Sequence, residues 1–582
     1  MVMAPPGIAQ QGPIRLFPER DTPPRTESTP ERESPRPLAP SGQRVAPRIE
    51  RAVPAAPRGE FVVEGLAAPE LDAIGLSGRT EGGFDRPLWQ GSDPELVSQL
   101  LADLPVVTLV PPLRELTRRL LVTGSPPGGS EPGRLLAARI ERLVAMGDLD
   151  AAKAVVDHLP PAATDSVLAR RAAEVALLLG DDQIACRVAD SLGPTSGADF
   201  WAEIAVYCRL VEDDRSGARL GLDLLREAGH NADDAFFALA SAIADQTGRP
   251  RLEDFAEPAA IHLALLALAG WPLPQDALTR AAPPVLAAVT RAPALAGADQ
   301  LAAIEQAFLV GATSADRVAA SYAEQDGAGG ADDLPSVQSN WDAEARAVAY
   351  AAVRAESDPL ARAALLDATW QAASGAERFL IAEVFAQPFI ELPIERRLAG
   401  VAPSAARALL AAERPVPAVG WLSLLTAEVG ADPQPQRAVA ALVPLFALAG
   451  VGGSDAVPRI DGAAMEAWQR ATTADQALAE RLFASLEGVG ASVEAGTWRN
   501  LLAGHYQREQ TAPATVLWRG LEQAVAERRV GDTVLFVLQM LNGQPQAVHP
   551  EVLVACLRAL GRVGLDRDAR AIAVATALIS DL

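Results

Sequence analysis

The residue types that most often carry out chemistry are few and scattered in this chain of 582 residues. None of its five histidines has a second histidine four residues away, the spacing that places two imidazoles on one helical face to bind zinc. The chain contains no HExxH, CxxC, GxSxG or P-loop motif, and its only lysine is Lys153. We therefore predict no catalytic, cofactor-binding or metal-binding residues and expect that the protein is not an enzyme.

Acidic residues are plentiful, with 74 Asp and Glu side chains, so neighbouring carboxylates arise easily by chance. The clusters at residues 212–214 and 332–333 coincide with predicted turns, where solvated carboxylates are expected. An acid/base pair or loose calcium binding is the alternative, although neither cluster has the spacing of an EF-hand loop. His262 lies in an apolar helical run and is predicted to be a hydrogen-bonded core histidine rather than a ligand.

The three cysteines, Cys186, Cys208 and Cys556, are too few to form a disulfide framework. Cys186 and Cys208 lie in apolar helical runs, where a cysteine usually packs as a small hydrophobic residue. We therefore expect structural cysteines rather than reactive thiols.

The composition predicts an all-α protein. Aromatic residues make up only 5% of the chain, and alanine, the strongest helix former, supplies much of its apolar mass together with leucine. The formal net charge of −23 argues against nucleic acid and anionic lipid as partners, because both require a cationic surface. The longest apolar runs fall short of the ~20 residues that a bilayer requires and contain prolines, so no transmembrane segment is expected.

Helical periodicity dominates from residue 105 onward. Leu136, Ile140 and Leu143 recur at the spacing of one helical face, and the chain then breaks at Gly147-Asp148. A second apolar stripe follows, so the two faces are expected to meet in an antiparallel hairpin. The next segment breaks at Gly180-Asp181, 33 residues after Gly147, which indicates a two-helix repeat.

A small residue is predicted five positions after each turn, where it faces the first helix of the hairpin and lets the two helix axes approach. Ala152 follows Gly147 at this distance, and in a third copy, which breaks at residues 212–213, Gly217 takes the position. The predicted turn and small residues of the repeat are Gly147, Asp148, Ala152, Gly180, Asp181, Ala185, Gly217, Gly564 and Ala569.

The Gly-Asp-x-x-x-Ala turn and the ~33-residue hairpin resemble tetratricopeptide (TPR) repeats, most closely in GDLDAA at 147–152 and GDDQIA at 180–185. The resemblance covers about 130 of the 582 residues. The family usually has a small residue seven positions before the turn glycine, which is Ala173 in the second unit but Ile140 in the first. The resemblance implies a right-handed α-solenoid whose concave face binds a peptide or another protein.

The proline-rich start, the segment GGFDRPLWQGSD and the alanine-rich helices also resemble exported bacterial proteins, some of which are labelled "antifreeze glycopeptide". That label would follow from the Ala- and Pro-rich composition alone. The chain has no lattice of regularly spaced hydroxyl groups that would bind ice.

Composition and the positions of turn-forming residues divide the chain into five parts. Residues 1–58 are rich in Pro, Arg and Glu, which predicts a disordered tail. Residues 59–104 are predicted to form a capping or linker segment with a short strand and a loop. The acidic stretch 324–340 is predicted to be a flexible loop between an N-terminal helical-repeat region, 105–323, and a C-terminal one, 341–582.

The first ten residues raise the question of export. Gly7-Ile8-Ala9 resembles the small-x-small site at which a secretory signal is cleaved. This resemblance predicts that residues 1–10 are the remnant of a longer signal peptide and that the protein is periplasmic or otherwise exported. The alternative is an ordinary tail on a cytoplasmic protein.

The segment before the repeats combines a predicted helix with bulky apolar residues. Ser92 is the predicted N-cap of a helix over DPELVSQLLADL, with Glu95 completing a capping box. The bulky residues either plug the end of the helical core, as a cap does, or form a recognition loop made of Phe84, Arg86 and Trp89.

These patterns predict an all-α fold, a right-handed α-solenoid of TPR-like hairpins after a disordered proline-rich tail. The function that this architecture favours is a non-enzymatic scaffold or adaptor for protein–protein interaction, without a cofactor. The alternative is a helical-bodied, carbohydrate-active enzyme that acts on cell-wall polymer and would need two carboxylates at a fixed separation.

Overall fold

The structure is a computed structural model. It describes residues 70–582 except 77, 79, 81, 125–131, 161–165, 193–198, 230–233, 253–254, 256, 326–340, 430–432, 452–459, 473, 502–512 and 581–582. The predicted tail, the signal remnant, the short strand before residue 67 and most of the 324–340 loop lie outside these residues.

The all-α prediction is confirmed for the part of the chain that the structure describes. It contains no strand there, only an isolated parallel bridge between Leu76 and Thr123. In this part no helix is long and apolar enough to cross a membrane. The helices of the first half are α1 (Pro94–Ala102), α2 (Pro111–Val122), α3 (Arg134–Ala145), α4 (Leu149–Val156), α5 (Ser166–Leu179), α6 (Asp182–Leu192), α7 (Asp199–Val211), α8 (Arg215–Glu227), α9 (Asp234–Ala244), α10 (Ala260–Ala269), α11 (Gln275–Thr279), α12 (Pro283–Arg291), α13 (Gln300–Val310) and α14 (Ala315–Ala323).

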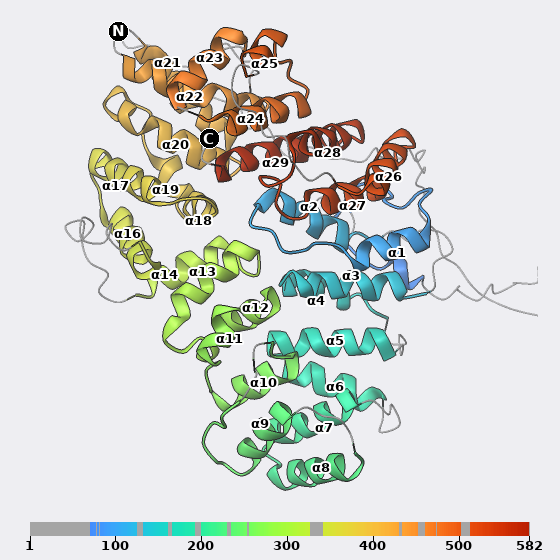
Figure 1. Ribbon diagram of the computed structural model, residues 1–582. Coiled ribbons are helices and arrows are strands. Elements are labelled where there is room, and N and C mark those ends of the chain that lie inside the picture. The colour runs from blue at the N-terminus through green and yellow to red at the C-terminus, as the bar shows by residue number, and fades with distance from the viewer. Residues whose placement is uncertain are drawn as a thin grey trace, which may run out of the picture. The chain divides into compact units, whose positions relative to one another are not determined.

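The second half continues the series, with neighbouring helices again in contact (Figure 1). Its helices are α16 (Ala343–Ala355), α17 (Pro359–Ala372), α18 (Glu377–Val384), α19 (Ala386–Glu391), α20 (Ala402–Ala411), α21 (Pro415–Glu428), α22 (Pro433–Leu448), α23 (Gly462–Thr472), α24 (Gln476–Gly488), α25 (Ala495–Leu501), α26 (Thr515–Ala526), α27 (Val530–Leu541), α28 (Pro550–Arg562) and α29 (Asp566–Ile579). Short 3-10 turns lie at Leu71–Ala73, Pro293–Leu295, Gly297–Asp299 and Arg396–Val401.

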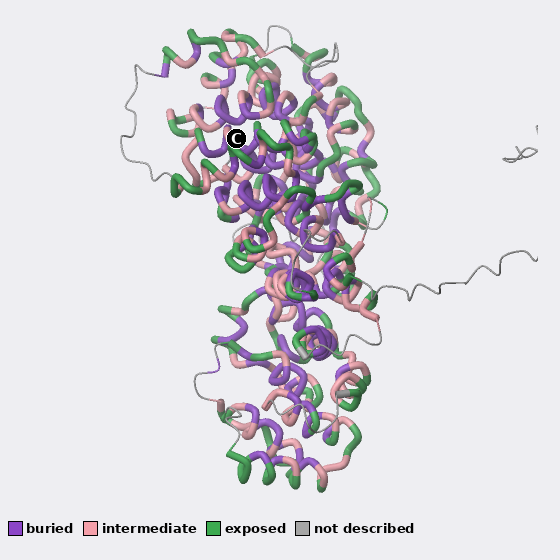
Figure 2. The backbone as a smooth tube through the Cα atoms, turned by 90° about the vertical axis from the view of Figure 1, so that its right-hand side faces the viewer, coloured by how far each residue is buried: buried purple, intermediate pink, exposed green. Residues whose placement is uncertain are grey.

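The two hairpins predicted on either side of residue 161 are present and lie side by side. Helix α3 packs on α4, α5 packs on α6, and α5 contacts both α3 and α4. Buried residues follow the sides of the helices that face other helices (Figure 2). One apolar stripe per helix is therefore covered by the next element, as the periodicity predicts.

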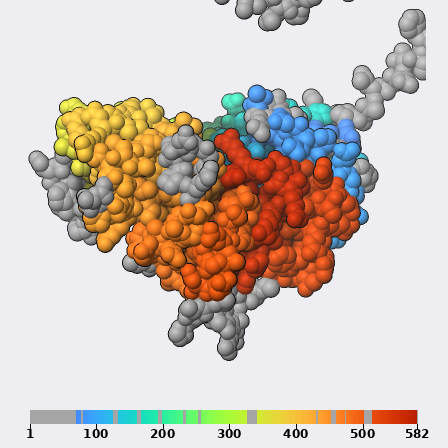
Figure 3. All heavy atoms as spheres, turned by 90° about the horizontal axis from the view of Figure 1, so that it is seen from above, coloured from blue at the N-terminus to red at the C-terminus, as the bar shows by residue number. Residues whose placement is uncertain are grey.

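The first helices of the chain pack against the last ones. Helix α1 contacts α27, and α2 contacts both α27 and α29. Gln539 Nε2 donates to the Leu100 carbonyl at 2.9 Å, and Thr108 Oγ1 donates to the Gly543 carbonyl at 2.6 Å. Figure 3 shows these early residues, in blue, lying against the red C-terminal helices. Segments more than 430 residues apart thus share one core.

A buried arginine anchors the segment before α1. The Arg139 guanidinium donates to the carbonyls of Leu121 at 2.7 Å, Val122 at 3.1 Å and Ile74 at 2.9 Å. Asp72 Oδ1 accepts a hydrogen bond from the Leu136 amide at 2.9 Å, which ties the same segment to the start of α3.

The start of α1 differs from its prediction by one residue. The N-cap is Asp93, whose Oδ1 accepts from the amides of Glu95 at 2.9 Å and Leu96 at 3.1 Å. The predicted N-cap Ser92 is wrong because Pro94 occupies the first helical position, where its fixed φ and missing N–H suit a helix start.

Candidate functional site

The repeat turns share one local motif, in which the end of one helix and the start of the next are capped by adjacent residues. Gly147 has φ +80°, and its amide donates to the Val144 carbonyl at 2.9 Å while the next amide, of Asp148, donates to Leu143 at 3.1 Å. This is a Schellman C-cap, and the Asp148 carboxylate then caps the following helix by accepting from the Ala151 amide at 3.0 Å. The Gly-Asp pair thus ends one helix and starts the next.

The same pair of hydrogen bonds recurs at Gly180-Asp181, where Gly180 has φ +74°. The small residues five positions after these glycines, Ala152 and Ala185, are fully buried, and Ala569 after Gly564 is 2% exposed. These positions are therefore buried in the core.

The third copy has a different register from the predicted one. The left-handed turn residue is Asp213, with φ +60°, so the small buried residue five positions later is Ala218 rather than Gly217. Gly217 instead donates its amide to the N-cap carboxylate of Asp214 at 2.9 Å. The predicted position of this turn was wrong because its left-handed residue is an aspartate rather than a glycine. Aspartate tolerates the left-handed conformation better than most residues do.

The bulky residues of the segment before α1 lie in the core. Phe84 is 6% and Trp89 1% exposed, and a Cβ on Gly531 of α27 would lie 2.4 Å from the Trp89 ring. Arg86 donates to the Val563 carbonyl at 3.1 Å. Trp89 therefore presents no free face to a partner, whereas Phe84 and Arg86 line a cavity beside α2.

Helix α2 carries a stripe of charged residues that the sequence analysis missed. Arg114 donates to the carbonyls of Leu309 at 2.5 Å and Thr108 at 3.2 Å, and burial lowers its pKa to about 10. Arg118 and Arg119 follow one turn later. The run RELTRR, which follows two prolines and a leucine, resembles a solvated helical face. Only the tertiary structure therefore shows that this stripe lies at the centre of the packing.

Three cavities that share lining residues adjoin α2, and together we call them the α2 groove. The apolar slot, of about 420 Å³, is lined mainly by small and aliphatic residues of α20, α21 and α29, including Leu410, Pro415 and Val574. The charged cavity, of about 290 Å³, shares Pro112, Glu413, Arg567 and Ala571 with the slot. The turn cavity, of about 760 Å³, shares Glu115 and Arg118 with the charged cavity.

Four helix–helix turns from separate parts of the chain line the α2 groove. They contain Gly147 and Asp148, Gly311, Glu413, and Gly564, in that order along the chain. Three of the predicted repeat-turn residues, Gly147, Asp148 and Gly564, are therefore at the groove, while Gly180 and Asp181 do not line it.

The charged cavity contains linked ion pairs. Arg118 Nε lies 2.9 Å from Glu115 Oε2, and Arg119 pairs with Asp568 of α29 and lies over the Phe84 ring. Arg567 Nη2 is 3.8 Å from Glu413 Oε2, and the Arg567 side chain is 82% exposed. Glu413 therefore has the loosest pairing of these carboxylates.

Partial burial perturbs several acids around the groove. Burial raises the pKa of Glu413 above its usual range, with smaller contributions from Asp568 and Glu115, and Arg567 opposes the shift. Burial likewise raises the pKa values of Asp568 and Asp148. Clusters of perturbed acids in a cleft are typical of functional sites, although structural ion-pair networks produce them too.

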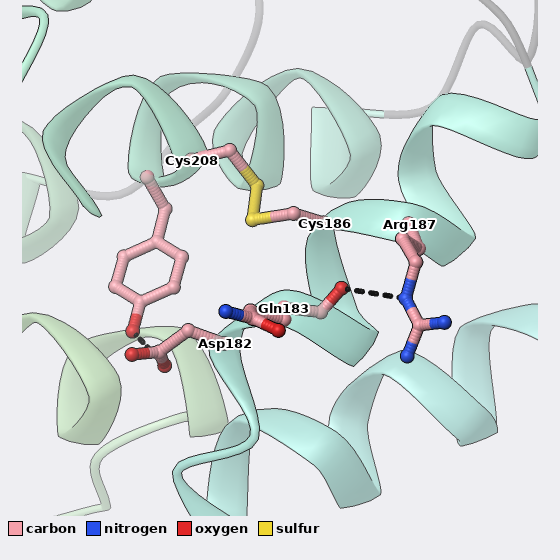
Figure 4. The surroundings of a disulfide bond; sticks show 6 residues. Asp182, Gln183, Cys186, Arg187 and Cys208 are labelled. Atoms are coloured by element: carbon pink, nitrogen blue, oxygen red, sulfur yellow. Dashed lines mark hydrogen bonds between the residues drawn. A yellow bond between two sulfur atoms is a disulfide. The ribbon is translucent and has the colours of Figure 1, made fainter. Parts of the chain in front are cut away.

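A disulfide was not expected from the sequence. Cys186 of α6 and Cys208 of α7 are bonded, with their Cα atoms 5.8 Å apart (Figure 4). The expectation that no disulfide forms is thereby corrected; the pairing depends on how α6 packs on α7, which the spacing of 22 residues does not reveal. Cys556 is a buried free thiol, and burial raises its pKa.

The remaining candidate residues give no further site. His262 is 4% exposed, and its Nδ1 accepts from the Ala259 amide at 3.2 Å, which confirms the core histidine. Within the described ranges no group of three or more His, Cys, Asp and Glu side chains could hold a metal ion. Compared with known proteins, the chain matches no protein-family model, no curated protein and no solved structure.

Proposed function

We propose that this protein is a non-enzymatic scaffold that binds another protein or peptide, and that the α2 groove is its binding surface. The observation that carries the proposal is the convergence of four helix–helix turns and α2 on three adjoining cavities, of which one is mainly apolar and one is charged. Ligand sites commonly combine an apolar pocket with a few convergent polar groups. The groove also lies where early and late helices meet.

We further propose that the hairpins form a TPR-like, right-handed α-solenoid. The shared Schellman turns and the buried alanines after them support this assignment. The packing of α1 and α2 on α27 and α29 adds long-range contacts to the nearest-neighbour contacts of a solenoid.

Export is the localisation that we propose. The Cys186–Cys208 disulfide supports it, because disulfides persist mainly in oxidising compartments. Peptide mapping of the protein isolated from its native cells without reduction tests this proposal. Recovery of both cysteines as free thiols would count against export.

The scaffold proposal is tested by capture of partners from the native compartment on the full chain. The expected result is a stoichiometric protein partner that is lost when Ala571, which lines two of the cavities, is replaced by tryptophan. Partners that bind the variant equally well would exclude the groove as the binding surface.

An enzyme acting on cell-wall polymer is the second candidate. It is favoured by the four carboxylates Asp85, Glu115, Glu413 and Asp568, which line one cavity, since glycosidases need two. Hydrolysis of isolated cell-wall polymer that is lost in both Glu413→Gln and Asp568→Asn would establish the enzyme and overturn the scaffold proposal.

A further inference from the structure

The apolar slot has the size and lining to hold one large side chain. Its volume of about 420 Å³ lies in the range of small-ligand pockets. Leu410 and Ala411 of α20 and Val574 and Ala575 of α29 supply apolar walls, and Pro415 begins α21 beside them. An aliphatic or aromatic side chain placed there would lose its contact with water and gain close packing.

Glu413 stands at the junction of the slot and the charged cavity, in an unusual backbone conformation. Its φ is +54°, and its amide and that of the next residue make the same Schellman hydrogen bonds as Gly147 and Gly564 in their turns. Glycine adopts this conformation without penalty, whereas glutamate does so at a cost. A glutamate thus occupies a position whose backbone conformation glycine would adopt with less strain.

The charges around Glu413 favour a cation as its partner. Arg118 and Arg119 already donate to carboxylates of the charged cavity. Arg567 pairs with Glu413 at 3.8 Å and is largely exposed, and Arg414 acts on Glu413 through its charge. The nearest cation to Glu413 is therefore one that a bound basic residue could replace. The chain as a whole carries a net charge of −23, which steers basic partners toward it.

We infer that the α2 groove binds an extended polypeptide segment in which a large apolar residue, seated in the apolar slot, neighbours a lysine or arginine that pairs with Glu413. This inference rests on the proposed scaffold function and specifies the chemistry of the partner. An exposed ion pair of this kind contributes at most about fivefold to affinity.

The experiment selects dodecapeptides from a random displayed library on the immobilised full-length chain, with counter-selection on Ala571→Trp. Selected peptides are then synthesised with fluorescein and titrated by anisotropy. The expected peptides contain Lys or Arg beside a large apolar residue. Their affinity should fall by up to about fivefold with Glu413→Gly and with Glu413→Gln, the loss of one exposed ion pair. The matched control is Glu522→Gln on α26, whose side chain is 60% exposed, and it should change nothing.

Glu413→Gly keeps the turn that glycine forms elsewhere, so a loss of binding in this variant does not come from misfolding. Groove-dependent peptides that lack basic residues, or whose affinity is indifferent to Glu413, would overturn the inference and leave the scaffold proposal standing. If peptides bind wild type and Ala571→Trp equally, the groove is not a binding surface, and both proposals fail.

Discussion

The guanidinium of Arg346 forms a bidentate pair with the carboxylate of Glu305, with Nε 2.9 Å from Oε1 and Nη2 2.6 Å from Oε2. The pair links α13 to α16 across the predicted break at 324–340. Both side chains are buried, at 9% and 5% exposure, and Tyr322 of α14 donates to the same carboxylate. Residues before and after the predicted break therefore share one buried network.

Removing one partner of this pair should destabilise the protein strongly. Arg346→Met leaves the Glu305 carboxylate buried without its cation, which costs about 3–5 kcal/mol. The double variant Glu305→Met/Arg346→Met should lose less, because no charge then remains buried. Urea unfolding measures both; a single variant that costs no more than the double variant would contradict this account.

Gly147 and Gly180 should differ in their tolerance of alanine, although both have left-handed φ values, +80° and +74°. A Cβ on Gly147 would lie 2.8 Å from Ala312 Cβ, whereas nothing lies within 4 Å of a Cβ on Gly180. We expect a loss of about 1 kcal/mol for Gly180→Ala from backbone strain alone and about 2–4 kcal/mol for Gly147→Ala, which adds overpacking. The Pro283 carbonyl oxygen lies 2.8 Å from the same Cβ, so equal losses in chemical denaturation would show that both Ala312 and Pro283 shift to make room.

Glu413→Gly should raise the free energy of unfolding, by about 0.5–1 kcal/mol, because glycine removes the left-handed strain but adds freedom to the unfolded chain. Thermal unfolding of the two proteins measures the difference. A destabilised variant would mean that the Glu413 side chain supports the fold, and the strain would then be no sign of a binding role.

Burial raises the pKa of Glu383, on α18, above its ordinary value of 4.5, and this should appear in the pH dependence of stability. The folded state binds the proton more tightly than the unfolded state, so stability falls as the pH rises from 4.5 through the raised pKa. Glu383→Gln should flatten this part of the curve of Tm against pH. An unchanged slope would exclude Glu383 as its source.

Loss of the Cys186–Cys208 disulfide should destabilise the protein by about 3 kcal/mol, because the bond closes a chain segment of 22 residues. The comparison is Cys186→Ala/Cys208→Ala against wild type in non-reducing urea unfolding. Alkylation of the native protein provides a check, since the buried Cys556 should stay unmodified until unfolding. Rapid modification of Cys186 in the unreduced protein would show that the bond is absent.

The sequence by itself determined the helical hairpins and most of their turns. A Schellman cap and the N-cap that follows it join atoms within a few residues of Gly147 and Asp148. A short stretch of sequence is therefore enough to predict the motif. Two predicted positions were wrong by one residue: the turn of the third copy is at Asp213, and the N-cap predicted at Ser92 is the next residue. In both cases the neighbouring residue satisfies the same sequence preferences.

Only the tertiary structure decided which helical faces meet. An apolar stripe shows that a face is buried but does not identify its partner, and α2 packs on α29, more than 440 residues away. The α2 groove, the pairing of Cys186 with Cys208 and the place of Glu413 beside Arg567 all depend on such contacts. They are set by the packing of whole helices, which no spacing within one segment encodes.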